Sequence, residues 1–467
     1  MKQIRINGRD NVAVMLEGEL AGHKIALKDI SAGENIIKYG YPIGHAVTDI
    51  KAGEHVHTHN TATNLSGTEQ YSYKPVNAAV KKHGGFKFGG FARKDGSVGI
   101  RNEIWIINTV GCVNKTSELL ARKASEKYGG GVYNFVHPFG CSQLGDDYKT
   151  TQKILKGLVN NPNAAGVLVL GLGCENNNIP AFKSVLGEYD GDRVKFMSAQ
   201  DYDDEIGEGS RLIEQLENYA NTFKRTECDS SELVVGLKCG GSDGFSGLTA
   251  NPLIGRVSDM LIGSGGSTVL TEVPEMFGAE TILMDRCADK ETFDKTVGLI
   301  NGFKNYFISH GQEVYENPSP GNKKGGITTL EDKSLGCVQK SGSAPVADVL
   351  ETGGSVKKRG LNLLTGPGND IVAVTNLAAA GCHMILFSTG RGTPVGAPVP
   401  TVKISTNSGL YERKPHWIDF NAGGILNGEE LDNSLFEYIR RVAGGEETNN
   451  EKHGYREISV FKDGVVL

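Results

Sequence analysis

The chain has 467 residues, of which 49 are lysine or arginine and 55 are aspartate or glutamate, so its formal net charge is −6. Hydrophobic residues make up 38% and charged residues 22%, which excludes a disordered or collagen-like chain. The slight acidity offers no broad cationic surface to a phosphate backbone, and we expect no nucleic acid partner. Glycine is the outlier, with 63 residues grouped at the ends of apolar runs. This pattern favours an enzyme with many binding loops.

No apolar run approaches the roughly 20 residues of a membrane span, and the first residues lack a secretory signal pattern. We therefore expect no membrane partner and a cytoplasmic location. Eight cysteines are too few for a disulfide scaffold in so long a chain. In a reducing compartment they would stay as thiols, able to bind a metal or act as nucleophiles.

The predicted elements divide the chain into three domains. Short apolar runs broken by turns predict a small all-β domain over residues 1–73, followed by a lysine- and glycine-rich linker over 74–100. Strand, glycine loop and helix then alternate, which indicates a parallel α/β domain over 101–228. A polar junction leads to a second, larger α/β series over 229–467.

Three cysteines occur in one repeated context in the middle domain. Cys112, Cys141 and Cys174 each follow a glycine just after an apolar strand, at intervals of 29 and 33 residues. Because parallel strands end at one edge of the sheet, we expect these thiolates to converge there. Three thiolates bind iron strongly, and a cluster held by only three leaves one iron open to a substrate hydroxyl. The alternative is three small buried side chains, since cysteine packs as a modest hydrophobe.

Cys239 is a fourth candidate metal ligand. It follows the strand expected at 233–237 and begins a loop of glycine, serine and aspartate that would add oxygen ligands. Cys337 and Cys382 carry a weaker signal.

Histidines and carboxylates supply the candidate bases. Strand alternation over 55–59 puts three imidazoles on one face, so His57 and His59 could bind a divalent metal or remove a proton. The alternative is a polar strand face with no such function. Glu272 and Glu275 follow the strand expected at 267–270, and either could be a base or a metal ligand. For Glu275, opening a helix after a proline is the more ordinary interpretation.

Several arginine and lysine residues lie beside glycines in predicted loops, which predicts that these loops bind a carboxylate. Arg391 lies between two glycines after an apolar strand, Lys323 and Lys324 follow a proline-rich turn, and Arg101 follows Gly99. Arginine binds a carboxylate through two parallel hydrogen bonds, so a carboxylated polyol would suit these loops. The alternative for the two lysines is a solvated turn. Dinucleotide and phosphate-loop motifs are not matched in the sequence.

Long motifs in the same order along the whole chain resemble those of the altronate and galactarate dehydratase family. They occupy residues 37–44, 53–60, 140–147, 171–176, 239–244 and 317–326. The segments 57–59 and 333–337 are most similar to the branch that acts on altronate.

The resemblance implies a multidomain α/β fold: an N-terminal β-clip (SAF-like) domain, a middle domain that helps a homodimer form, and a C-terminal variant of the Rossmann topology. It also implies a hydro-lyase of sugar acids that depends on iron or another divalent metal such as manganese. The iron requirement agrees with the thiol pattern, which leaves open a single Fe²⁺ or a three-cysteine iron–sulfur cluster. In the altronate branch, D-altronate is converted to 2-dehydro-3-deoxy-D-gluconate in hexuronate (galacturonate) breakdown. The alternatives are a galactarate dehydratase or a sulfolactate sulfo-lyase of the same family, and, from another class, a non-catalytic sugar-acid-binding protein.

These expectations combine into one mechanistic hypothesis. Arg391 with Lys323 or Lys324 clamps the substrate carboxylate, iron binds the hydroxyl on carbon 3, and a base removes the proton from carbon 2. His57, His59 and Glu272 are the three candidate bases. A Lewis acid and fixed cations are needed because this deprotonation places further negative charge next to a carboxylate.

Overall fold

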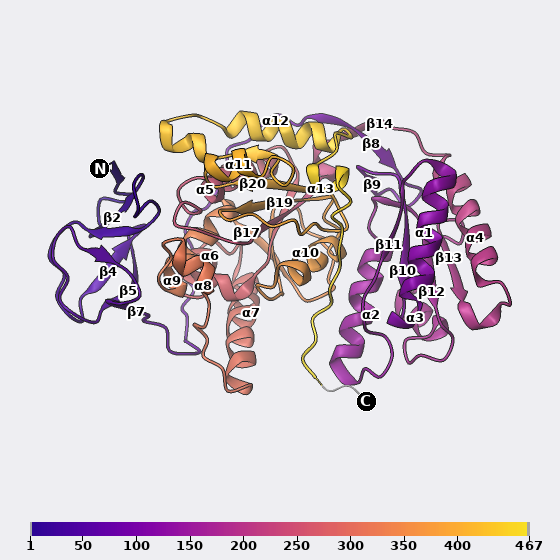
Figure 1. The fold of residues 1–467 in the computed structure, drawn as a ribbon, viewed down its shortest axis with the longest axis horizontal. Coiled ribbons are helices and arrows are strands. Elements are labelled where there is room, and N and C mark those ends of the chain that lie inside the picture. The colour runs from indigo at the N-terminus through magenta and orange to yellow at the C-terminus, as the bar shows by residue number, and fades with distance from the viewer. Residues whose placement is uncertain (1, 465–467) are drawn as a thin grey trace.

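The computed structural model describes residues 2–464, which form three domains in a row (Figure 1). The N-terminal strands (indigo) lie at one end, the C-terminal α/β domain (orange to yellow) lies in the centre, and the middle domain (magenta) lies at the other end. Among the described residues, no helix has the length and apolar character needed to cross a membrane.

The N-terminal domain is all-β, as predicted, and consists of two small sheets with strand orders β1-β2-β3-β6 and β4-β5-β7. Its strands are β1 (Gln3–Ile4), β2 (Val12–Met15), β3 (Lys24–Ala26), β4 (Asn35–Lys38), β5 (Tyr41–Ala46), β6 (His55–Val56) and β7 (Thr61–Ala62). The strand expected over 55–59 ends at Val56, because Asn60 closes a turn. Its side chain accepts from the His57 N–H at 2.9 Å, and its own N–H donates to the His57 carbonyl at 3.0 Å.

The segment expected to be a linker is partly a sheet. An irregular stretch runs along the C-terminal domain, where Tyr71 donates to Glu280 at 2.6 Å. The chain then enters the antiparallel strands β8 (Lys87–Ala92) and β9 (Val98–Gly99), and β8 also pairs with β14 (Thr226–Asp229). β8 and β9 lead into the middle domain and β14 follows it, so this small sheet lies where the chain enters and leaves the middle domain.

The middle domain is a four-stranded parallel sheet in the order β11-β10-β12-β13, which confirms the predicted alternation. Its strands are β10 (Glu103–Asn108), β11 (Val132–Phe135), β12 (Ala164–Gly171) and β13 (Val194–Ser198). Its helices are η1 (Gly111–Val113), α1 (Asn114–Tyr128), α2 (Gly145–Val159), α3 (Ile179–Leu186), η2 (Ala199–Asp201) and α4 (Glu205–Ala220). All residues of β10 and β12 are buried, as expected for parallel strands covered by helices on both faces.

The C-terminal domain is a seven-stranded sheet in the order β17-β18-β16-β15-β19-β20-β21, with every neighbouring pair parallel. Its strands are β15 (Val234–Cys239), β16 (Ser267–Leu270), β17 (Val346–Leu350), β18 (Leu361–Leu364), β19 (Met384–Thr389), β20 (Thr401–Ser405) and β21 (Phe420–Asn421). Its α-helices are α5 (Ala250–Gly263), α6 (Glu280–Met284), α7 (Lys290–Ser309), α8 (Pro320–Lys324), α9 (Leu330–Cys337), α10 (Asp370–Ala379), α11 (Ser408–Arg413), α12 (Asp432–Ala443) and α13 (Asn449–Lys452). Short 3₁₀ turns η3 (Ser230–Glu232), η4 (Val273–Met276), η5 (Val338–Ser341) and η6 (Gly423–Asn427) complete it.

Hydrophobic cores continue across both domain boundaries. One cluster joins N-terminal residues such as Ile36 to Leu335 of α9, and another joins Leu155 of α2 to Leu377 of α10. At the first boundary, Asp332 of α9 also accepts from the ammonium groups of Lys24 at 2.7 Å and Lys38 at 2.9 Å, and all three side chains are buried. The N-terminal domain is therefore fixed to the helix that carries Cys337.

Candidate functional site

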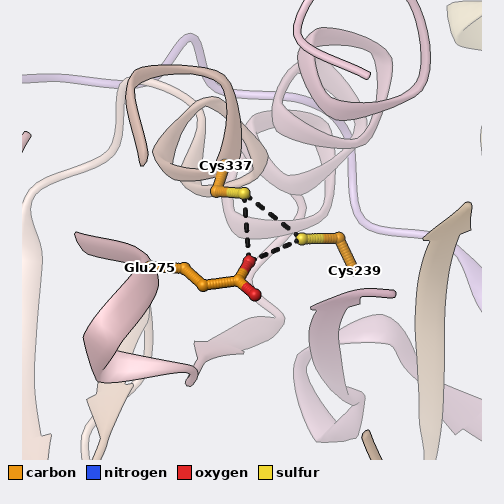
Figure 2. Close-up of side chains that lie close together, drawn as sticks. All are labelled: Cys239, Glu275 and Cys337. Carbon is orange, nitrogen blue, oxygen red and sulfur yellow. Dashed lines mark hydrogen bonds between the residues drawn. The ribbon is translucent and has the colours of Figure 1, made fainter. Parts of the chain in front are cut away.

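Two thiols and one carboxylate meet in the C-terminal domain (Figure 2). The Sγ atoms of Cys239 and Cys337 lie 3.3 Å apart, and each lies 3.1 Å from Oε2 of Glu275. All three side chains are buried. Among the described residues, these three form the group of histidine, cysteine or carboxylate side chains whose ligand atoms all lie within 4.8 Å of one another.

The sheet topology brings these side chains together. Cys239 is the last residue of β15, and Glu275 lies in η4 just after the neighbouring strand β16. Parallel strands end at the same edge, where α/β folds bind ligands. Between β16 and η4, Glu272 adopts a left-handed backbone conformation with φ 70°, and its carboxylate accepts from the Cys239 N–H at 2.9 Å. Cys337 is the last residue of α9, which lies over this edge.

Three lysines surround the carboxylates next to the thiols. Lys333 donates to Glu275 at 2.8 Å, and Lys340 donates to Glu272 at 3.2 Å. Lys238 pairs with Glu272 and, at 2.8 Å, with Asp370. Three ammonium groups thus balance three carboxylates, so two thiolates would add a net charge of −2. One divalent cation would neutralise that charge.

The same charges set the pKa values of the ligands. Burial alone would raise the pKa of the Glu275 carboxyl, but the neighbouring lysines, first of all Lys333, hold that pKa well below its usual range. The hydrogen bond with Cys239, together with burial, raises the pKa of the Cys337 thiol well above its usual value. Without a cation, the Cys337 thiol therefore keeps its proton, and metal binding would release it.

A cavity of about 460 Å³ opens beside the thiols. Cys239, Glu275 and the glycines that follow β15 form part of its wall, and a side chain at Gly240 would collide with Asp370 at 2.7 Å. The polar side chains of its wall are Glu316, Asn317, Ser319, Asn322, Lys333 and Asp370. The cavity is thus polar, charged and in contact with two of the three candidate ligands, as a site for a hydroxylated anion would be.

The donor set fits a divalent metal ion. Metal–sulfur bonds are roughly 2.3 Å long, and the largest separation in the set, 3.3 Å, is less than twice that length, so one ion could contact all three atoms. Thiolate and carboxylate ligands suit iron, zinc and manganese. Because Cys239 and Glu275 line the cavity, a small molecule in the cavity could reach an ion held by these residues.

Three of the four predicted carboxylate-binding residues lie near this cavity. The backbone N–H of Arg391 donates to the carbonyl of Gly241 at 3.0 Å, and its side chain passes next to Gly321. Lys323 and Lys324 end α8, whose N-cap Ser319 and third residue Asn322 lie in the cavity wall.

The predicted bases occupy two different places. Glu272 is fully buried, and both of its carboxylate oxygens are engaged by Lys238, Lys340 and the Cys239 N–H. His57 and His59 belong instead to a group of four imidazoles with His23 and His55. Four pairs of these rings have centroids 5.1 to 5.6 Å apart. This histidine group contacts the end of α8, because His57 Nε2 lies 2.8 Å from the Lys323 carbonyl oxygen.

The other four predicted site residues lie in or next to the middle domain, away from Cys239. Cys112, Cys141 and Cys174 are exposed and follow β10, β11 and β12, whereas Cys239 is buried and ends a strand of the other parallel sheet. Arg101 is buried just before β10, where its Nε donates to Glu451 at 2.6 Å. The structure thus brings Cys239 together with Cys337 and Glu275, and it places Arg101 in an internal ion pair.

The sequence carries only a weak signal that Cys337, Glu275 and Lys333 belong to the site. Lys333 and Cys337 are four residues apart, which puts them on the same side of a helix. That spacing is the signal that could have linked the two residues, but nothing in it connects them to a strand end almost a hundred residues away.

Fold and site together define a multidomain α/β enzyme with a thiol–carboxylate centre beside a polar cavity. Three family patterns match this chain: "Altronate/galactarate dehydratase SAF domain" over residues 19–64, "D-galactarate dehydratase/Altronate hydrolase, second domain" over 90–221, and "D-galactarate/Altronate dehydratase, C-terminal" over 230–466. The chain belongs to the altronate/galactarate dehydratase family.

Individual relatives are similar along nearly their whole length. The chain is 54% identical to an altronate dehydratase of Escherichia coli (strain K12), covering 98% of this chain and 94% of the relative. It is also 54% identical to an altronate dehydratase of Bacillus subtilis (strain 168), covering 96% and 92%. A galactarate dehydratase (L-threo-forming) of Escherichia coli (strain K12) is 32% identical, covering 99% and 97%.

Proposed function

We propose that this protein is a hydro-lyase that removes water from D-altronate and forms 2-dehydro-3-deoxy-D-gluconate. The observation that carries the proposal is the pair of buried thiols with Glu275 at the wall of a polar cavity. The 54% identity to two altronate dehydratases supports altronate over galactarate, for which the relative is 32% identical.

We propose Fe²⁺ as the ion held by Cys239, Glu275 and Cys337, with manganese as the alternative. When bound, the ion supplies Lewis acidity that makes the hydroxyl on carbon 3 a better leaving group. Lys333 keeps the Glu275 carboxylate ionised and oriented toward the thiols. Glu272 holds the end of β15 in place through the Cys239 N–H, so we assign it a positioning role.

The substrate carboxylate is proposed to bind at the rim formed by Arg391 and the end of α8, where Lys323 and Lys324 lie. Clamping it there points the hydroxylated carbons into the cavity and toward the ion-binding residues. Fixed cations at this position stabilise the charge that develops when the carbon 2 proton leaves.

We propose three acceptors for that proton: His57, His59 and Asp370. The two histidines come from the sequence argument. Asp370 lines the cavity, and its side chain is 32% exposed, whereas that of Glu272 is 1% exposed. A base needs access to the proton that it removes, which favours Asp370 over Glu272.

A keto-acid assay tests this function. Anaerobically purified protein loaded with Fe²⁺ should release a 2-keto acid from D-altronate faster than from galactarate. Faster turnover of galactarate would assign the chain to the other dehydratase, and sulfite release from sulfolactate would make it a sulfo-lyase. Binding of altronate with metal present but without any keto acid would instead indicate a sugar-acid-binding protein.

A further inference from the structure

Three of the eight cysteines have a setting that the proposed catalytic cavity does not explain. Cys112, Cys141 and Cys174 are exposed, whereas the other five cysteines are buried. Each of the three lies in the connection that directly follows a strand of the middle sheet, Cys112 within η1, and those strands, β10, β11 and β12, are neighbours.

The loops that carry the first two thiols are bonded to each other. The N–H of Gly111, next to Cys112, donates to the carbonyl of Phe139 at 2.9 Å. Gly140, next to Cys141, has φ 97°, and a side chain there would collide with the Thr109 backbone. The absence of a side chain therefore lets the two cysteine loops pack in direct contact.

The third loop is tied to both of the others. Thr109 donates to the carboxylate of Glu175, next to Cys174, at 2.8 Å. The N–H of Asn177 donates to the carbonyl of Gly140 at 3.0 Å. All three cysteines are thus one residue away from a group that joins two of the loops, so the three cysteine loops lie next to one another at one edge of the sheet.

A buried polar group beside these loops lacks a partner. Gln143 is 3% exposed, and its Oε1 accepts from the Gly140 N–H at 3.2 Å, but its Nε2 finds no hydrogen-bond acceptor. A buried unsatisfied donor is costly unless a bound group completes it. Gln143 lies two residues after Cys141 in the sequence.

The strand order of the middle sheet also indicates that the edge with the cysteine loops is a binding position. The chain leaves β10 toward β11 on one side and leaves β12 toward β13 on the other, so the crevice between the loops after β10 and β12 is the topological switch point of the sheet. Ligands of open α/β sheets bind in such crevices.

The spacing of the thiols favours a cluster over a single ion. Among the described residues, these three sulfurs do not form a set with all members within 4.8 Å of one another, as one bound ion would require. An iron–sulfur cluster attaches each thiolate to a different iron, so its cysteine ligands need not meet at one atom.

We propose that Cys112, Cys141 and Cys174 hold an iron–sulfur cluster in which one iron has no protein thiolate. This centre is separate from the thiol–carboxylate site of the C-terminal domain, and Cys239 is not one of its ligands. It goes beyond the proposed function, and its test requires no turnover.

The test measures inorganic sulfide, which a cluster contains and a single ion does not. Protein purified anaerobically, or reconstituted with Fe²⁺ and sulfide, should be brown and contain acid-labile sulfide together with iron. Cys112→Ser, Cys141→Ser and Cys174→Ser should each lose most of the sulfide and the near-visible absorption.

Matched variants separate this centre from the rest of the molecule. Cys228→Ser, at a buried cysteine of β14, should keep the sulfide, as should Cys239→Ser, which removes a ligand of the other site. Circular dichroism checks that each variant is folded. Iron without sulfide in the unmodified protein, or full sulfide in all three loop variants, would overturn the proposal while leaving the altronate assay unaffected.

Discussion

Glu275 is the residue on which the geometry of the candidate metal site depends. Its Oε2 accepts from both thiols at 3.1 Å, while its Oε1 binds Lys333 at 2.8 Å. One carboxylate thus fixes the two sulfurs relative to each other and links them to the positive charge beside them. Removing its charge while keeping its shape tests whether this arrangement binds a metal.

We predict that Glu275→Gln weakens binding of Fe²⁺ or Mn²⁺ by at least about 10-fold, because a neutral amide is a poorer ligand and leaves Lys333 uncompensated. Anaerobic titration followed by metal analysis measures the affinity. Glu316→Gln is the control, since Glu316 lines the same cavity but is not among the three ligand residues. Equal affinities in the two variants would remove Glu275 from the ligand set.

The site could be predicted only in part from individual residues. Cys239 and Glu272 follow apolar strands, and a strand end in a parallel sheet is a recognisable position. Cys337 has no such marker, because it ends a buried helix and meets Cys239 only through tertiary packing over a separation of 98 residues. Glu275 follows a proline, a pattern equally typical of a structural helix start.

Among the elements, α9 joins two functions within eight residues. Its first turn carries Asp332, which holds two lysines of the N-terminal domain, and its last residue is Cys337. Because a short helix moves as a unit, the position of the thiol depends on how the N-terminal domain is docked.

We predict that Asp332→Asn lowers the free energy of unfolding by about 3–5 kcal/mol, since it leaves Lys24 and Lys38 buried without a counter-charge. Urea unfolding measures the loss. The exposed pair of Lys51 and Asp29, 2.8 Å apart, provides the comparison, and Asp29→Asn should leave the free energy of unfolding almost unchanged. A similar cost for both variants would show that the buried charges do not anchor the domain.

The histidine group between the N-terminal strands and α8 predicts a dependence on pH. Burial, together with the neighbouring imidazoles, lowers the pKa of His55 to about 4 from its ordinary 6.5. Between these values the unfolded chain binds more protons than the folded chain, so stability is complete above pH 6.5 and falls as the pH drops toward 4.

Comparing urea unfolding at pH 7 and pH 5 should reveal this loss. For His55 we expect about 1 kcal/mol, allowing for solvent screening of a half-exposed ring. His55→Gln should reduce the difference between the two pH values, whereas His453→Gln, outside the group, should not. An unchanged difference in His55→Gln would contradict the assignment.

At the level of elements, the sequence predicted both parallel sheets because their strands are continuous apolar runs followed by glycine loops. It did not predict that β8 and β9 form a sheet within the expected linker. β8 pairs with β9 across a short turn and with β14 far along the chain, and the second of these pairings leaves no local pattern.

For the molecule as a whole, the candidate metal ligands come from three elements: β15, η4 and α9. A bound ion would therefore link the sheet to the helix that anchors the N-terminal domain. Ligands that bind only the folded state stabilise it by mass action.

We predict that free Fe²⁺ or Mn²⁺ at 100 times its dissociation constant stabilises the chain by about 2.7 kcal/mol, and that a chelator reverses this gain. Anaerobic thermal unfolding with and without metal measures it as a rise in the midpoint. Cys337→Ser should abolish the rise. A rise that persists in this variant would place the stabilising ion elsewhere.

The position of α9 late in the chain has a consequence for biosynthesis. The N-terminal domain leaves the ribosome first, yet its two buried lysines meet their counter-ion only after residue 332 has been made. The second thiol follows five residues later. A nascent chain that stops short of this helix has neither a docked first domain nor all three candidate ligands, so a metal ion at this site could be bound only after residue 337 has been synthesised.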